Sequence, residues 1–300
     1  MQVYRHLPKQ THAPQALAIG NFDGLHLGHQ ALLAKLVSTA QAKHITPAVM
    51  TFEPHPREFF MPQAAPARLS SMREKLEYFA EAGVQEVYVV RFNHAFAAIS
   101  AQDFMQHMLR ESLNANTILV GGDFCFGAKR QGTVQSFVQA GFDLVDFPQV
   151  EINGVRVSST LVRDALAAGE LLQAQQLLGR PYSISGKVVH GAKRGRQLGY
   201  PTANVHMRHE RPPFTGVYAV KLDGLLGVAN LGVRPTIAGI PKLMLEVHVF
   251  DFNGNLYDQH VHVQFYHKLR NEMKFDGLDA LKAQIAQDVT AAQNYFKNLP

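Results

Sequence analysis

Residues 16 to 29 read ALAIGNFDGLHLGH, and this order of residue types predicts a strand, a loop and a helix in succession. The apolar run of residues 16–20 ends at a glycine, and the polar residues Asn21 and Asp23 follow it. Beyond them, apolar side chains recur at helical spacing, at Ala31, Leu32, Leu33, Leu36 and Val37. Backbone N–H groups at the start of such a helix favour an anion, so the loop is a candidate phosphate site.

The alternation of strand and helix continues through the first half of the chain. Candidates for buried strands lie at residues 48–52, 87–90, 117–120 and 142–145, and helical patterns occupy residues 71–82 and 100–112. This order predicts an α/β domain with a parallel sheet and helices on both faces. Ligands of such sheets bind beyond the carboxyl ends of the strands, where the loop after residue 20 would lie.

The pattern changes after a predicted helix at residues 159–178. Strand-like segments follow at residues 183–189, 216–222, 225–230, 243–250 and 261–266. Asp223-Gly224 and Asn253-Gly254 are turn dipeptides of the kind found between paired strands, so we expect a small antiparallel β-barrel. A final helix from Leu278 to about Phe296 would pack on its outside. The predicted domains are residues 1–180 and 181–300.

The composition is that of a globular protein with a modest positive charge. Of 300 residues, 46% are hydrophobic and 18% are charged, enough apolar surface to offset the entropy of ordering. The first residues lack the apolar run of a signal peptide, no segment reaches the length of a membrane span, and the one cysteine, Cys125, suits a reducing compartment. We expect a cytoplasmic protein that does not bind membranes. The net charge of +5 suits anionic ligands without deciding between nucleotides and nucleic acid.

The first candidate site is the loop and helix start of residues 20–29. His26 and His29 stand at positions i and i+3, so their imidazoles would flank one pocket and could donate hydrogen bonds to a phosphoryl transition state. Such a pair can also lie on a surface or form half of a metal site. The glycine between them permits close approach of a phosphate, and the H-x-G-H pattern resembles that of nucleotidyltransferases, in which both histidines contact the triphosphate. The predicted phosphate-binding residues of this loop are Gly20, Phe22, Asp23, Gly24 and Gly28.

A second phosphate-binding element is predicted where Arg156 leads, through a run of hydroxyl residues, into a helix. The hydroxyls could cap this helix while its N–H groups and Arg163 bind phosphate oxygens. A plain helix cap is the alternative. The predicted phosphate-binding residues of this element are Arg156, Ser159, Thr160 and Arg163.

A third element, in the predicted barrel, is residues 191–204, which read GAKRGRQLGYPTAN. A glycine-rich basic loop can cradle phosphates through its backbone N–H groups, although this one lacks the residue order of a P-loop. A solvated surface loop is the alternative for its charges. The predicted phosphate-binding residues here are Gly191, Lys193, Gly195, Gly199 and Pro201.

Three motifs of the second half occur in a specific order. They are GYPTANV at 199–205, GVY at 216–218 and LGVRPT at 231–236, and the similarity continues through Glu246 and from Phe265 to Phe275. In this the chain resembles riboflavin kinases, and over essentially its whole length it resembles the bifunctional bacterial riboflavin kinases and FMN adenylyltransferases, or FAD synthetases. The resemblance implies a Rossmann-like nucleotidyltransferase domain followed by a riboflavin kinase barrel.

The same resemblance implies two reactions and their substrates. The barrel would transfer the ATP γ-phosphate to the 5′-hydroxyl of riboflavin, and the first domain would join AMP from a second ATP to the resulting FMN, giving FAD. Nucleic acid would not be a partner. Thr202 and Asn204 would hold Mg²⁺ and phosphate oxygens, and Glu246 would orient or deprotonate the hydroxyl.

The resemblance also implies residue roles in the first domain. His26 and His29 would contact the ATP phosphates, and Ser159, Thr160 and Arg163 would add phosphate contacts. The loop G-x-D-F-x-F-G would bind flavin and nucleotide through Asp123, Phe124 and Phe126. Relatives often carry arginine where this chain has Cys125 and Leu161.

Two other functions fit parts of the sequence. An adenylyltransferase for another acceptor could carry the barrel as a binding module, although Pro201, Thr202, Asn204 and Glu246 argue against this. A non-enzymatic RNA-binding protein would use the basic stretch and a small barrel, but the aromatic rows of a stacking platform are lacking there. The oligomeric state cannot be predicted from these patterns.

Overall fold

The computed structural model describes residues 1–6, 8, 13–147, 149–191, 199–207, 212–234 and 242–299. The chain divides into two compact units. The first consists of Met1–Pro66 and Met72–Val157, and the second of Ala67–Ser71 and Ser158–Pro300. The division by contacts therefore falls between Val157 and Ser158, whereas the sequence patterns placed a boundary near residue 180.

The core of the first unit is a parallel sheet, as predicted. In the described part of the chain it has six strands, in the spatial order β1 (Gln2–Tyr4), β4 (Glu86–Arg91), β3 (Thr46–Glu53), β2 (Gln15–Ile19), β5 (Ala115–Leu119) and β8 (Asp143–Leu144). Each neighbouring pair runs parallel. The edge strand β1 was not predicted, because Gln2–Tyr4 is too short to show a pattern.

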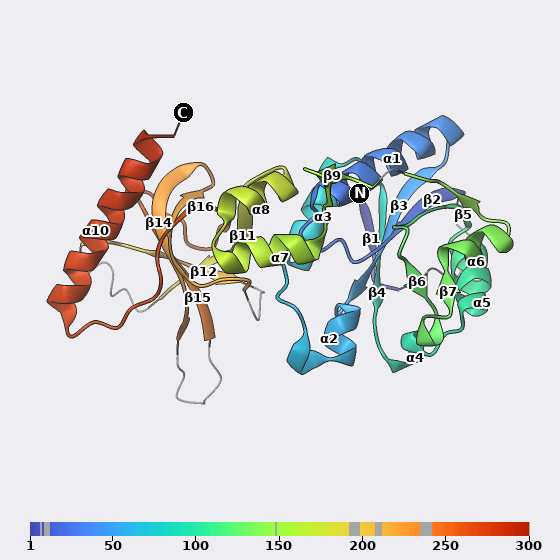
Figure 1. Cartoon of the computed structure of the whole chain (residues 1–300), viewed down its shortest axis with the longest axis horizontal. Coiled ribbons are helices and arrows are strands. Elements are labelled where there is room, and N and C mark those ends of the chain that lie inside the picture. The colour runs from blue at the N-terminus through green and yellow to red at the C-terminus, as the bar shows by residue number, and fades with distance from the viewer. Residues whose placement is uncertain are drawn as a thin grey trace. The chain divides into compact units, whose positions relative to one another are not determined.

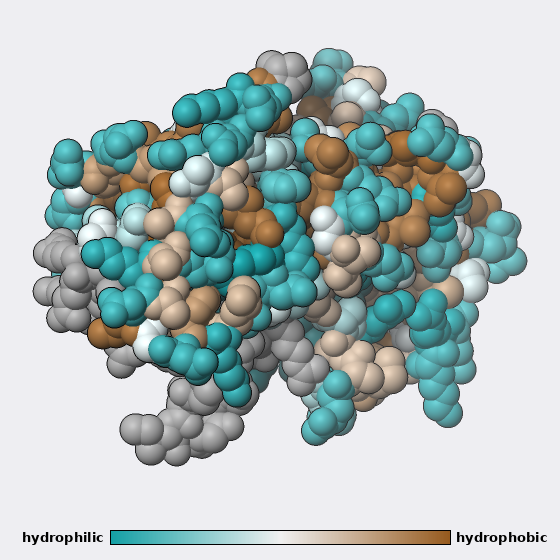
Figure 2. Space-filling view, turned by 60° about the vertical axis from the view of Figure 1, so that its left-hand side comes forward, coloured by the Kyte–Doolittle hydropathy of each residue, from teal (hydrophilic) through white to brown (hydrophobic). Residues whose placement is uncertain are grey.

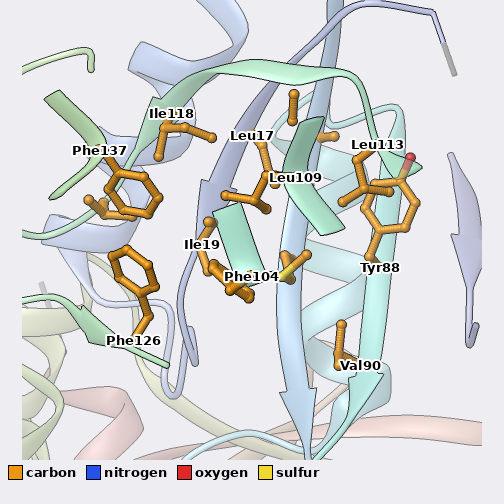
Figure 3. Packing of buried hydrophobic residues seen from close by; sticks show 14 of the residues in the cluster. Leu17, Ile19, Tyr88, Val90, Phe104, Leu109, Leu113, Ile118, Phe126 and Phe137 are labelled. Carbon is orange, nitrogen blue, oxygen red and sulfur yellow. The ribbon is translucent and has the colours of Figure 1, made fainter. Parts of the chain in front are cut away.

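Helices cover both faces of this sheet, as Figure 1 shows and as the alternation predicted. Successive side chains of β2 point to opposite faces, so Ala16 and Ala18 pack under α1 (Leu27–Lys43) and α3 (Met72–Glu81). Leu17 and Ile19 pack on the other side, in the cluster of Figure 3, against Phe104 of a π-helix, η2 (Phe104–Ser112).

The remaining elements of the first unit are short. They are α2 (Pro56–Phe60), η1 (Pro62–Ala64), α4 (His94–Ala97), α5 (Ala101–Asp103), β6 (Cys125–Phe126), η3 (Ala128–Arg130), β7 (Gly132–Thr133), α6 (Val134–Gln139), β9 (Glu151–Ile152) and β10 (Val155–Arg156).

The second unit contains a closed antiparallel barrel, which confirms the prediction for this half. The strands follow one another around it in the order β11 (Tyr182–Val189), β12 (Ala203–Met207), β15 (Lys242–Val249), β14 (Leu225–Arg234), β13 (Gly216–Leu222) and β16 (His260–Arg270). Asp223 and Gly224 form the tight turn between β13 and β14 with positive φ angles of 46° and 89°.

Two expectations for the second unit were wrong. Asn253-Gly254 does not join paired strands, because it lies between β15 and β16, which are not neighbours in the barrel. The single helix expected at residues 159–178 is two helices, α7 (Ser159–Ala168) and α8 (Leu171–Leu178). Gly169 ends α7 with a φ of 83°, a left-handed conformation that glycine adopts without strain.

The final helix, α10 (Leu278–Lys297), packs against the barrel as predicted (Figure 1). Ala292 is fully buried with Val217 and Ala219 of β13. The Arg270 guanidinium donates hydrogen bonds of 2.8 to 3.1 Å to the carboxylate of Asp288, and both side chains are largely buried. This ion pair ties the end of β16 to the middle of α10.

The surface is mixed in character. On the face drawn in Figure 2, hydrophilic residues surround separate hydrophobic patches. Among the described residues, no helix combines the length and the apolar character that a membrane span requires.

Candidate active sites

The H-x-G-H turn brings the two predicted histidines together. His26 is the N-cap of α1, and its Nδ1 accepts a hydrogen bond of 3.4 Å from the backbone N–H of His29. The two imidazoles stack, with centroids 3.8 Å apart and an angle of 20° between their planes. A Cβ on Gly28 would lie 3.1 Å from the His26 ring, so a larger residue would crowd the stack. The motif therefore builds a compact pair at the carboxyl end of β2.

The loop before this pair holds an unusual backbone path. Phe22, Gly24 and Leu25 have φ angles of 49°, 82° and 41°. The Phe22 ring is buried and packs edge-on against Phe79 and tilted against His29. Its side chain therefore supports the histidine pair from the core, and a phosphate would meet the backbone of this loop.

Lys75 is a buried cation beside this loop that sequence reasoning missed. Its Nζ donates a hydrogen bond of 2.8 Å to the carbonyl oxygen of Asn21, which also lies 3.4 Å from the hydroxyl of Thr51. In the helical pattern of residues 71–82, position 75 lies on the same face as Met72, Leu76 and Phe79, which pack against the core. The signal was present, but a lysine is rarely fully buried.

The surroundings of the histidine pair lower the pKa of His29. Burial, then the neighbouring His26 and the charge of Lys75, hold the pKa of His29 well below its usual range. The His29 Nδ1 makes no hydrogen bond within the part of the chain that the structure describes. His29 is therefore a neutral imidazole with an unused polar atom, and a phosphate anion would relieve the positive field that surrounds it.

The predicted flavin and nucleotide ligands Asp123, Phe124 and Phe126 follow β5. The Arg156 guanidinium lies 3.0 Å from Asp123, and this hydrogen bond lowers the pKa of the Asp123 carboxyl. Phe126 is buried and its ring lies beside that of Phe137 (Figure 3); the two rings stack with their centroids 4.4 Å apart. Phe124 is only partly buried. Asp123 and Phe124 thus remain accessible, whereas Phe126 belongs to the core.

The hydroxyl run of Ser158, Ser159 and Thr160 forms the start of α7, in the second unit. The cap is Ser158, whose side chain accepts a hydrogen bond from the N–H of Leu161, so Ser159 and Thr160 stand in the first helical turn. The Nε of Arg163 donates a hydrogen bond of 2.6 Å to the carbonyl oxygen of Ala67. This confirms that a hydroxyl caps the helix and leaves the phosphate contacts as predictions.

The barrel aligns the predicted kinase residues on its outer face. In β15, Leu245 and Val247 are buried inside the barrel, while Glu246 and His248 alternate outward and are partly buried. Register places Asn204 of β12 directly beside Glu246. The apolar residues on either side of Glu246 therefore form the buried face of β15. The carboxylate of Glu246 lies on the opposite, outer face of the same strand.

Asn230 is a second neighbour of Glu246, and sequence reasoning did not single it out. It faces Glu246 from β14, opposite Asn204. Directly paired residues of antiparallel strands have Cβ atoms about 4.5–5.5 Å apart. The side chains of Asn204 and Asn230 therefore flank Glu246 from the two neighbouring strands. These strands are distant in the sequence, so no local pattern reveals the arrangement.

The loop that leads into β12 lies close to this face. A Cβ on Gly191 would collide with the amide of Asn204, which explains a glycine there. Gly199 has a φ of 86°, and Thr202 is partly buried one position before β12. The carbonyl oxygen of Pro201 lies 2.9 Å from Nδ1 of His248. The predicted residues Lys193 and Gly195 lie outside the described residues.

Comparison with known proteins also divides the chain into two parts. A family model described as FAD synthetase matches residues 8–161, and one described as riboflavin kinase matches residues 178–296. The crystal structure of a macrolide-efflux protein from Streptococcus pneumoniae superposes with a TM-score of 0.81 at 29% identity, covering 100% of both chains.

Curated relatives match over nearly the full length. The bifunctional riboflavin kinase/FMN adenylyltransferase of Escherichia coli K12 is 46% identical, covering 99% of this chain and 98% of the relative. That of Haemophilus influenzae is 44% identical, covering 99% and 100%. This chain belongs to the family of bifunctional riboflavin kinase/FMN adenylyltransferases, with its FAD synthetase domain first and its riboflavin kinase domain second.

Proposed function

We propose that this chain makes FMN on the outer face of the barrel, around Glu246, and makes FAD at the H-x-G-H turn, with a separate ATP at each place. The observation that carries the proposal is the strand register that sets Asn204 beside Glu246. It unites a motif and a carboxylate that lie far apart in the sequence. The stacked histidines of the first unit support the second half of the proposal.

In the kinase reaction, Glu246 would accept or orient the proton of the riboflavin 5′-hydroxyl, whose oxygen attacks the γ-phosphate of ATP and displaces ADP. The partly buried position of Glu246 shields the carboxylate from bulk water without isolating it. Asn204 and Asn230 flank it on the two neighbouring strands. The backbone of Gly191 and Gly199 would contact the phosphates of ATP.

Thr202 and Asn204 would hold Mg²⁺. A hydroxyl and an amide carbonyl are hard oxygen ligands of the type that Mg²⁺ accepts alongside phosphate oxygens, and both residues precede or begin β12 next to Glu246. When bound, the ion would supply positive charge to the phosphates during transfer. The residues present therefore fit a magnesium nucleotide.

In the adenylyl transfer, an FMN phosphate oxygen attacks the α-phosphate of ATP and pyrophosphate leaves. His26 and His29 would donate hydrogen bonds to the phosphates, since charge builds there in the transition state. The N–H groups at the start of α1 add positive potential at the same place. No covalent intermediate on the protein is required.

The remaining predicted contacts complete the proposal for the first reaction centre. Asp123 and Phe124 would contact flavin or nucleotide, and Arg156, Ser159, Thr160 and Arg163 would contact phosphates. The single cysteine suits a reducing compartment, which supports a cytoplasmic location.

The purified protein, given riboflavin and Mg²⁺-ATP, should form FMN first and FAD after it, as followed by chromatography of the flavins. Removal of Mg²⁺ by a chelator should stop FMN formation. An enzyme that adenylates another acceptor and uses its barrel for binding alone would leave riboflavin unchanged. A protein that binds RNA with a steep salt dependence and turns over no ATP would contradict both reactions.

A further inference from the structure

His248 makes a contact that no step above uses. It stands two positions after Glu246 in β15, so both side chains emerge on the same outer face of the barrel. Its Nδ1 lies 2.9 Å from the carbonyl oxygen of Pro201. A carbonyl oxygen can only accept a hydrogen bond, so Nδ1 carries the proton and donates it. The contact thus fixes which nitrogen of His248 is protonated.

The contact occurs where ordinary strand pairing stops. The register between β12 and β15 runs from Val205 and Leu245 to Ala203 and Val247. Pro201 has no N–H and cannot extend this ladder as a donor. The side chain of His248 binds the Pro201 carbonyl instead, and the Tyr200 ring packs edge-on against the imidazole at 5.3 Å.

This arrangement anchors the backbone just before the two proposed magnesium ligands. Thr202 follows Pro201 directly, and Asn204 lies beside Glu246. Strand β15 therefore supports the site twice, with the carboxylate of Glu246 and with the imidazole of His248. A shift of the Pro201 carbonyl would move the Thr202 hydroxyl relative to Glu246.

We propose that His248 is a positioning residue of the riboflavin kinase site, whose Nδ1–H holds the Pro201 carbonyl and so places Thr202 and Asn204 for a magnesium nucleotide. The inference rests on the proposed roles of Thr202 and Asn204. It assigns His248 no contact with the substrates. A histidine that only fills space beside Tyr200 would depend on its ring and not on its N–H group.

Two substitutions separate the N–H group from the ring. His248→Asn keeps an amide N–H near the place of Nδ1, and His248→Leu keeps a similar volume without a donor. The binding of Mg²⁺-ADP to the full-length protein is followed through the NMR signals of Thr202 and Asn204, which report on the barrel alone. His248→Leu should raise the dissociation constant about three- to tenfold, and His248→Asn should stay within about twofold of the parent protein.

The same chain supplies an internal control. The conversion of added FMN to FAD takes place in the other domain and should be unchanged in both variants. The KM for riboflavin should also stay unchanged, while the KM for Mg²⁺-ATP in FMN formation should rise with the dissociation constant. Equal losses in His248→Leu and His248→Asn would overturn the proposal, because the ring and not its N–H would then matter.

A third variant separates this inference from the proposed function. If Thr202→Ala leaves Mg²⁺-ADP binding unchanged, the proposed role of Thr202 fails whatever His248 does. If Thr202→Ala weakens binding and His248→Leu does not, the positioning role of His248 is overturned. If His248→Leu does not fold, His248→Gln takes its place. The glutamine amide lies farther from the backbone than Nδ1 of the histidine, so His248→Gln should lose the Mg²⁺-ADP affinity that His248→Asn keeps.

Discussion

The positive charge of Lys75 lies next to a histidine that is already kept neutral by its surroundings. Burial is the largest cause of the lowered pKa of His29, and His26 and Lys75 add to it. Lys75 also holds the Asn21 carbonyl, so the cation is fixed in place relative to the loop. A bound triphosphate would offset this positive field. These surroundings would suit an anion at the turn.

Replacing Lys75 by methionine should raise the pKa of His29, because one of the three causes that lower it is removed. The pKa should remain below about 6.5, the usual value for histidine, because burial persists. NMR titration of the His29 imidazole measures this directly. FAD formation from added FMN should fall as well, while FMN formation from riboflavin should not.

The matched control is Lys43→Met. Lys43 lies at the far end of α1 in an exposed ion pair with Asp143. This change should leave the His29 titration where it was. A pKa for His29 that moves equally in both variants, or falls in Lys75→Met, would contradict the local electrostatic explanation.

Several site residues could be predicted from the sequence because they belong to a short motif of neighbouring residues. His26, Gly28 and His29 form one motif at a strand-to-helix turn, and the structure stacks the two rings. The helical spacing placed Lys75 on a buried face but did not show its contact with the Asn21 carbonyl, and no local pattern marked Asn230, whose partner lies on another strand. A motif reveals contacts between residues that are close in the sequence, whereas contacts between distant segments become visible only in the strand register.

Elements with strong periodicity were predicted well, and their interruptions were not. Strand β2 and helix α1 match the expected pattern, with alternate residues of β2 buried on opposite faces. The apolar pattern of residues 159–178 continues across Gly169, so the break between α7 and α8 is visible only in the left-handed backbone. The π-helical winding of η2 was likewise not visible, because its inward-facing residues Phe104, Met105, Met108 and Leu109 recur at a spacing that also suits an α-helix.

The Arg270–Asp288 pair joins α10 to the end of β16. The exposed fractions of the two side chains are 17% and 7%. Replacing Asp288 by asparagine leaves a mostly buried guanidinium without its counter-charge, which costs about 3–5 kcal/mol in comparable buried pairs. We expect the barrel to unfold at a clearly lower urea concentration, as followed by circular dichroism, and FMN formation to be lost at a lower temperature.

Asp258→Asn is the control for this element. Asp258 pairs with Lys187 at 2.7 Å, but both side chains are largely exposed. The unfolding midpoint should hardly change, since solvent screens such pairs. If Asp288→Asn were as mild as Asp258→Asn, the buried pair would not be what holds α10.

Two kinds of sequence pattern predict the folds of the two halves of the chain. Strands that alternate with helices gave a parallel sheet, and short strands joined by turns gave an antiparallel barrel. The boundary near residue 180 stays a prediction. Contacts assign α7 and α8 to the second unit, where α8 packs on β11 and β16, although both helices precede that boundary.

The central claim is that one chain carries two separate reaction centres, each with its own residues. It is tested most directly by flavin chromatography of the His29→Ala and Glu246→Ala proteins, each given riboflavin or FMN with Mg²⁺-ATP. His29→Ala should still convert riboflavin to FMN and lose FAD formation roughly 100-fold or more. Glu246→Ala should lose FMN formation by about 100-fold or more and still convert added FMN to FAD. If either folded variant lost both reactions together, the assignment of two independent centres would be wrong.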